Sequence, residues 1–255
     1  MKQNLSIQPI NLGQISIEKS LLTFRRNYGV MADIVCIGWV IRGGNKVTLI
    51  DTGPPSPEIA ALHHWPFART DAQHIDRALA GIGLRCDDIE TVILTHLHWD
   101  HCYNLEYFQR AEFIVQKSEL AYAVAPLPAE RRSYEVDIPT LRPPWMQVVD
   151  RIIPVDGDVE IHPGISVIHL PGHTPGSQGI LVDTKDGTWV IAGDAVPLYD
   201  NLEETDTVQI LPSGLYQNMF DYHDSLKRLE PFRGTILPGH DARVFRERRY
   251  PAGTP

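Results

Sequence analysis

A series of short apolar runs, rich in β-branched residues and bounded by Gly, Pro or Asp, recurs along most of the chain. Runs of this kind predict β-strands. The predicted strands are Ile34–Ile41, Lys46–Asp51, Thr91–Thr95, Glu112–Gln116, Asp150–Val155, Gly164–Leu170, Gly179–Thr184, Thr188–Asp194 and Gly234–His240. The pair Asp186-Gly187 separates two of these runs and predicts the turn of a hairpin.

Helical patterns lie between the predicted strands. In Thr70–Gly83 the apolar residues recur at helical spacing, and Thr70 and Gln73 have the spacing of a capping box. Asp221–Phe232 and Lys117–Ala125 are the other predicted helices. Strands that alternate with helices, with a hairpin among them, predict an α/β fold in which helices cover a mixed sheet. We expect residues 1–255 to form a single domain, with a long irregular Pro-rich segment, Ala125–Trp145, between its two halves.

Charge and cysteine content exclude several classes of protein. The formal net charge of −9 argues against a nucleic-acid partner, and the arginines near the C-terminus are interpreted as a solvated segment. Three cysteines without a C-x-x-C pair favour a reducing compartment. The first residues, MKQNLSIQPINLGQ, lack the apolar core of a signal peptide, and no run reaches membrane-spanning length. We therefore expect a cytoplasmic protein with no membrane partner.

The stretch Thr95–His101, THLHWDH, crowds potential metal ligands directly after a predicted strand. Loops that follow strand ends are where α/β sheets bind ligands. His96, His98, Asp100 and His101 offer four donors within six positions, which favours a metal site over a solvated His-rich loop.

Three further potential ligands, His173, Asp194 and His240, each follow another apolar run and stand beside a glycine. The seven side chains suffice for two metals, and five imidazoles with two carboxylates suit Zn²⁺ or a similar divalent ion. Cys102 is interpreted as a packing residue. The sequence has no G-x-S-x-G, Walker A or G-x-G-x-x-G motif.

The series HLHWDH, PGHTPG, AGD and PGH, preceded by TLIDTG, resembles the metallo-β-lactamase fold superfamily from about Ile34 to His240. The resemblance implies a four-layered αββα sandwich of mixed sheets. It also implies the ligand assignment: His96, His98 and His173 for the first metal, Asp100, His101 and His240 for the second, and Asp194 bridging both. Asp51 resembles an aspartate that steadies a histidine ligand, although a turn residue is the alternative.

Within this superfamily the resemblance implies a hydrolase in which a hydroxide that bridges two Zn²⁺ ions attacks an ester carbonyl. Asp100 would steer the nucleophile and pass a proton to the leaving group. The 72 positions between His101 and His173, with their Pro-rich segment, resemble the N-acyl homoserine lactonase-like branch, so the expected substrate is a lactone or related small cyclic ester. Glyoxalase II-like thioesterases and mononuclear iron persulfide dioxygenases remain alternatives.

The chain departs from the lactonase pattern at Cys102–Asn104 and at Pro197, where that branch carries a tyrosine that assists the substrate carbonyl. Tyr199 or Tyr216 would replace it, or both are packing residues. Aromatic and apolar residues are expected either at the pocket wall or in the core: Trp65, Phe67, Trp145 and Met146. The expected partner is a small-molecule substrate, and a homodimer is an assembly that the chain could form.

Overall fold

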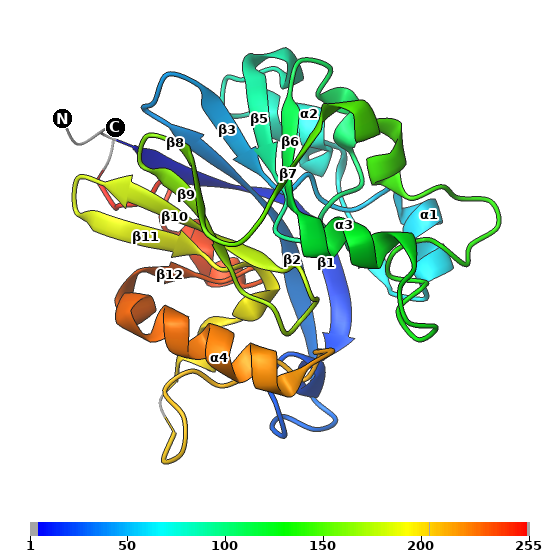
Figure 1. The fold of residues 1–255 in the computed structure, drawn as a ribbon, viewed down its shortest axis with the longest axis vertical. Coiled ribbons are helices and arrows are strands. Elements are labelled where there is room, and N and C mark those ends of the chain that lie inside the picture. Colours follow the sequence, from blue (N-terminus) through cyan, green and yellow to red (C-terminus); the bar gives the residue numbers. More distant parts are fainter. Residues whose placement is uncertain (1–4, 204, 254–255) are drawn as a thin grey trace.

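Two mixed β-sheets pack face to face, with helices on their outer surfaces (Figure 1). The computed structural model describes residues 5–203 and 205–253. The prediction that the first residues do not form a signal peptide includes residues 1–4, which lie outside the described part of the chain. Within the described ranges no helix combines the length and the apolar character that a membrane crossing requires.

The first sheet has seven strands in the order β4-β1-β2-β3-β5-β6-β7. Their bounds are β1 (Ser6–Glu18), β2 (Met31–Arg42), β3 (Val47–Ile50), β4 (Phe67–Ala68), β5 (Ile89–Ile93), β6 (Glu112–Gln116) and β7 (Ile152–Val155). Strands β3, β5, β6 and β7 pair in parallel. The loops that leave β3 and β5 therefore emerge at the same edge of the sheet.

The second sheet has five strands in the order β12-β11-β10-β9-β8. Their bounds are β8 (Val159–His162), β9 (Ile165–His169), β10 (Gln178–Thr184), β11 (Gly187–Ile191) and β12 (Ile236–Leu237). Strands β10 and β11 form the hairpin predicted around Asp186-Gly187. Strands β11 and β12 are parallel, so the segments carrying Asp194 and His240 also leave the sheet side by side.

Three apolar cores correspond to the three interfaces of a four-layered sandwich. The first lies between the seven-stranded sheet and the helices α1 (Pro57–Ala60), α2 (Ile75–Ala80) and α3 (Lys117–Val124). The second joins the inner faces of the two sheets, and the third packs α4 (Met219–Leu229) on the five-stranded sheet. The helices thus lie on opposite outer faces (Figure 1). The predicted αββα fold is confirmed.

All nine predicted strands are present, but the prediction missed β1, β4 and β8. The long strand β1 pairs antiparallel with β2 along most of its length, with a register shift between Asn11 and Gln14. Gly13 lies in this bulge at a φ of 125°, where a Cβ atom would approach the Phe67 ring to 2.5 Å. Pro9 and Gly13 interrupt the alternation that marks a strand, which is why the sequence conceals β1.

The helix predicted over Thr70–Gly83 is shorter than expected. Helix α2 covers only Ile75–Ala80, and the capping box belongs to the separate 3₁₀ turn Asp71–Gln73. In that turn the Thr70 backbone N–H donates to the Gln73 side chain at 2.7 Å. The Pro-rich segment is irregular as predicted, since no helix or strand covers the described residues from Ala125 to Pro143.

Candidate metal centre

The loop after β5 folds back so that the rings of His96, His98 and His101 lie close together. The His101 backbone N–H donates to the His98 carbonyl at 3.0 Å, which closes a tight turn. The His101 carbonyl in turn accepts the backbone N–H groups of Thr52 and Gly53, in the loop that follows the parallel strand β3. The edge of the parallel sheet therefore fixes where the ligands stand.

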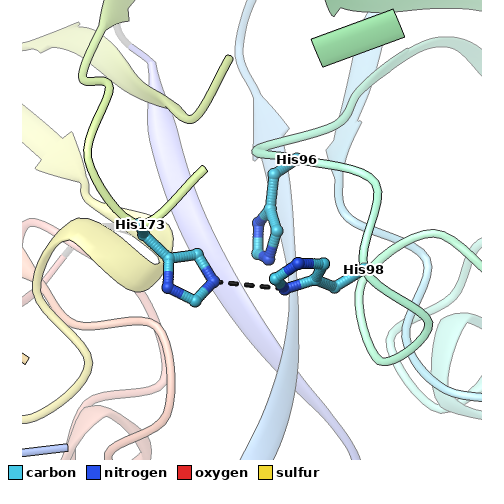
Figure 2. A group of neighbouring side chains, drawn as sticks. All are labelled: His96, His98 and His173. Atoms are coloured by element: carbon cyan, nitrogen blue, oxygen red, sulfur yellow. Dashed lines mark hydrogen bonds between the residues drawn. The ribbon is translucent and has the colours of Figure 1, made fainter. Parts of the chain in front are cut away.

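Three histidines converge at the first position (Figure 2). His98 Nδ1 and His173 Nε2 are 3.2 Å apart, and the His96 ring lies 4.5 Å from the His98 ring centroid and 4.9 Å from that of His173. The nitrogen atoms that the three rings offer all lie within 4.8 Å of one another. Such a group of buried imidazoles has the dimensions of a first metal position.

Asp194 joins this group to a second one. Its Oδ2 lies 3.4 Å from His173 Nε2, while its Oδ1 lies 3.0 Å from His240 Nε2 and 3.3 Å from His101 Nε2. Asp100 completes the second group, with Oδ2 3.6 Å from His101 Nε2. The structure thus brings all seven predicted ligands together, and the carboxylate of Asp194 faces both groups.

Burial and charge set the protonation of these rings. Burial lowers the pKa of His96 and of His98 well below the ordinary histidine value, so both rings are neutral and able to bind a metal. Burial acts in the same direction on His101, but the carboxylates of Asp100 and Asp194 outweigh it and raise its pKa well above that value. Burial raises the pKa of Asp194, but His240 and His101 outweigh it and hold that pKa well below the usual range.

Several buried side-chain nitrogen and oxygen atoms in this cluster make no hydrogen bond of regular geometry within the described residues: Nε2 of His96, His98 and His101 and Oδ1 of Asp194. An unpaired buried polar atom is costly, so such atoms are normally satisfied by a ligand, a water or an ion. Their convergence and their chemistry fit divalent cations.

Hydrogen bonds to the other ring nitrogen orient three of the imidazoles. Asp51 accepts from His101 Nδ1 at 2.8 Å, the Leu215 carbonyl from His173 Nδ1 at 3.0 Å, and the Val35 carbonyl from His240 Nδ1 at 2.9 Å. This arrangement turns Nε2 of each ring toward the other predicted ligands, as metal binding through Nε2 requires. Asp51 has a φ of 56°, and of the two interpretations drawn from the sequence its contact with His101 supports the partner of a histidine.

Two glycines let the loop that carries His173 approach its supports. A Cβ atom on Gly176 would lie 2.2 Å from the Glu119 backbone nitrogen in α3. A Cβ atom on Gly172, whose φ is 139°, would lie 2.3 Å from the Tyr222 Cα atom in α4. The PGHTPG segment is therefore held between helices from the two outer layers of the sandwich.

A cavity of about 250 Å³ opens onto the ligands. Its wall includes Ile15, Ile17, Leu22, Ile34, Trp65, Trp99, Glu130, Ser133, Leu215, Tyr216 and Gln217. Trp65 both lines the cavity and packs against the first core, so the two sequence interpretations each describe it. Phe67 and Trp145 pack against the same core, and Met146 is exposed.

The two candidate tyrosines lie in different surroundings. Tyr216 lines the cavity together with His173. Tyr199 is absent from that lining: its ring packs on the inter-sheet core and lies 5.2 Å from the Arg243 guanidinium. Pro197, which stands where the lactonase-like branch carries a tyrosine, accepts the His240 backbone N–H through its carbonyl.

The departure at Cys102–Asn104 serves to fasten the ligand loop. Cys102 is buried and donates to the Leu97 carbonyl at 3.4 Å, in agreement with a packing role. The Asn104 amide donates to the Thr52 and Pro54 carbonyls at 2.7 and 3.0 Å. These contacts tie the ligand loop to the loop after β3.

Sequence reasoning missed two side chains near the ligands. The Cys36 thiol lies in β2 with its sulfur within 4.8 Å of donor atoms of Asp100 and His240. The Glu119 carboxylate is buried and hydrogen-bonded beside the first group. Neither stands in a His-rich motif, so only the packing of distant segments reveals them.

Comparison with known proteins agrees with this geometry. The family model of the metallo-beta-lactamase superfamily matches residues 36–240. An N-acyl homoserine lactonase of Bacillus cereus is 30% identical over 204 residues, which cover 75% of this chain and 76% of the relative. The N-acyl homoserine lactonase AttM of Azorhizobium caulinodans is 30% identical over 212 residues, or 79% of this chain and 76% of the relative.

Solved structures show the same fold. An N-acyl homoserine lactone hydrolase, with the product N-hexanoyl-L-homoserine bound at its catalytic metal centre, superposes with a TM-score of 0.77 at 22% identity over 96% of both chains. AidC, a dizinc quorum-quenching lactonase, has a TM-score of 0.69 at 16% identity and covers 95% of this chain and 90% of its own. This chain therefore belongs to the metallo-beta-lactamase superfamily, in the branch of N-acyl homoserine lactonase-like metal-dependent hydrolases.

Proposed function

We propose that this enzyme opens the ring of a lactone, or of a related small cyclic ester, with water activated by two divalent cations. The observation that carries the proposal is the carboxylate of Asp194, which faces two groups of predicted ligands in a cavity lined by polar and apolar side chains alike. Zn²⁺ is the cation that the donor set favours, and a dizinc lactonase among the structural neighbours supports that choice.

The seven side chains divide the work of holding the cations. His96, His98 and His173 would hold the first, Asp100, His101 and His240 the second, and Asp194 both. Two bound cations would supply Lewis acidity and would lower the pKa of water, so that a hydroxide nucleophile is available at neutral pH. The neutral state of His96 and His98 prepares the first position without loss of a proton.

Asp100 and Tyr216 are the side chains best placed to act on the substrate itself. Asp100 lines the cavity beside the second group, where its carboxylate can orient the attacking water and carry a proton to the departing ring oxygen. Tyr216 lines the same cavity, and a hydroxyl there can donate to the substrate carbonyl oxygen. The departing oxygen stays attached to the product because the bond that breaks lies in a ring.

The cavity wall favours a neutral substrate with an apolar substituent. Apolar and aromatic side chains supply much of the lining, and among the described lining residues none is Lys or Arg. Glu130 adds a carboxylate whose Oε2 lies 4.0 Å from His98 Nε2. A glutathione thioester would bring free carboxylates to a wall that offers them repulsion and no cationic partner, so the lactone is the better match.

The test is an activity comparison on protein reconstituted with Zn²⁺ and assayed for metal content. N-hexanoyl-L-homoserine lactone and a glutathione thioester are the two substrates, with ring opening and thiol release as readouts. We expect turnover of the lactone with a kcat/KM at least about 100-fold above that of the thioester, because like charges placed against one another cost several kcal/mol. Preference for the thioester would replace the proposal with a glyoxalase II-like activity. In the protein as purified, before reconstitution, one iron per chain with oxygen consumption on glutathione persulfide would replace it with a dioxygenase.

A further inference from the structure

Glu119 in α3 is a fully buried carboxylate surrounded by hydrogen-bond donors. Its Oε1 accepts the Leu97 backbone N–H at 2.9 Å and the Tyr134 hydroxyl at 2.8 Å. Its Oε2 accepts the Thr174 hydroxyl at 2.6 Å and the Gly176 backbone N–H at 3.1 Å. All four partners donate, so both oxygens act only as acceptors, which is the pattern of an ionised carboxylate.

The four donors belong to three segments that are far apart in the sequence. Leu97 stands between His96 and His98 in the loop after β5. Thr174 follows His173, and Gly176 closes the same turn between β9 and β10. Tyr134 belongs to the Pro-rich segment, and its ring lies edge-on to the His98 ring at 4.9 Å. One carboxylate therefore contacts both loops that bear the first-group histidines and the Pro-rich segment that packs on His98.

The loop that carries His173 also packs very closely on the backbone of Glu119. Gly176 lies so near the Glu119 backbone that any side chain at position 176 would collide with α3. Glu119 thus holds the His173 loop in two ways: its carboxylate accepts hydrogen bonds from the loop, and its backbone packs against Gly176. This arrangement fixes the distance between the His96–His98 turn and His173.

We infer that Glu119 is a positioning residue that sets the geometry, and hence the metal affinity, of the first position. The inference rests on the proposed two-metal function. A carboxylate that only stabilised the fold would affect both metal positions through general unfolding. A carboxylate that aligns the three histidines affects the first position selectively, because its donors Leu97 and Thr174 are direct sequence neighbours of those histidines. None of its four donors is adjacent in sequence to Asp100, His101 or His240.

The matched substitution is Glu119→Gln, which keeps the shape of the side chain. Its amide NH₂ group replaces one acceptor oxygen, so two of the four hydrogen bonds can no longer form. Glu135→Gln is the control, because Glu135 is equally buried and pairs with His63 instead of the ligand loops. Zinc content is measured after dialysis against chelator-buffered Zn²⁺, with thermal unfolding of the metal-free proteins alongside. We expect two zinc ions in wild type and Glu135→Gln but one in Glu119→Gln, with about a 10- to 100-fold weaker first position.

Combining Glu119→Gln with His240→Ala shows which of the two metal positions has lost its zinc ion. His240→Ala weakens the second position, so the single variant should keep one zinc ion and the double variant with Glu119→Gln should keep none. If Glu119→Gln does not fold, Thr174→Val and Tyr134→Phe each remove one donor and should weaken the first position by smaller factors. Wild-type affinity in these variants, or equal zinc loss in Glu135→Gln, would overturn the inference. A wild type that binds no zinc would overturn the proposed function as well.

Discussion

Asp51 accepts a hydrogen bond from His101 Nδ1 at 2.8 Å across 50 positions of sequence. The same carboxylate accepts the Thr95 backbone N–H and the Thr95 hydroxyl, at 2.8 and 2.7 Å. A residue at the end of β3 thereby fixes both the start of the ligand loop and the orientation of one ligand within it.

Asp51→Asn should weaken the second metal position by about 10- to 100-fold, because an amide cannot accept from all three donors and the His101 ring loses its anchor. Asparagine suits the experiment because it tolerates the positive φ of this position. Zinc titration monitored by calorimetry measures the two affinities. Asp71→Asn, at an exposed site, is the control. Unchanged affinity at both positions would show that the Asp51 contact does not act on the metal.

Asp194→Ala should lower zinc content at both positions and abolish lactone hydrolysis, because Asp194 faces the first and the second group alike. Elemental analysis of the purified variant checks the metal content, and the activity assay follows. Asp186→Ala, in the exposed turn of the β10–β11 hairpin, should retain both. An Asp194→Ala protein with two zinc ions at full affinity would contradict the bridging assignment.

The two positions should respond differently to acid. The pKa of His101 is raised by Asp100 and Asp194, and that of His240 by Asp194, in each case against the effect of burial. A metal at the second position must displace the protons of these two rings. Metal affinity at the second position should therefore fall first as the pH drops. His96 and His98 have lowered pKa values and compete with protons only at lower pH.

Zinc content after dialysis at a series of values between about pH 8 and pH 5, the range in which histidine titrates, checks this order. As the pH falls, zinc content should drop from two ions per chain to one, stay near one over an interval of pH, and then drop to zero. Calorimetry at neutral pH in buffers of different ionisation enthalpy should detect proton release with the second ion and little with the first. Simultaneous loss of both ions would refute the ordered release.

Tyr216→Phe should lower kcat about 100-fold, the scale of one lost oxyanion donor, with zinc content unchanged. Tyr199→Phe is its matched counterpart and should leave kcat/KM unchanged, because that ring packs beside Arg243 and away from the cavity lining. Steady-state kinetics on the lactone measures both. The reverse pattern would assign the assisting hydroxyl to Tyr199.

The local patterns of the sequence were sufficient to predict the sheet-rich fold and the gathering of the seven ligands. Each ligand follows an apolar run, and the ends of parallel strands meet at one edge. Strand β1 escaped because Pro9 and the bulge at Gly13 break its alternation. Glu119 escaped because its partners come from segments that no local pattern connects. The choice between Tyr199 and Tyr216 depends on how the loops after β11 fold, which side-chain periodicity does not encode.

Much of the cavity wall comes from parts of the chain that carry no predicted ligand. The ligands leave the ends of β5, β9, β11 and β12, whereas Ile15 and Ile17 come from β1, Ile34 from β2, and Glu130 and Ser133 from the Pro-rich segment. Substitutions or insertions in the wall segments can therefore reshape the substrate chamber while the reactive centre stays intact. Such a separation allows descendants of one ancestral enzyme to acquire new ester substrates without inventing the chemistry again.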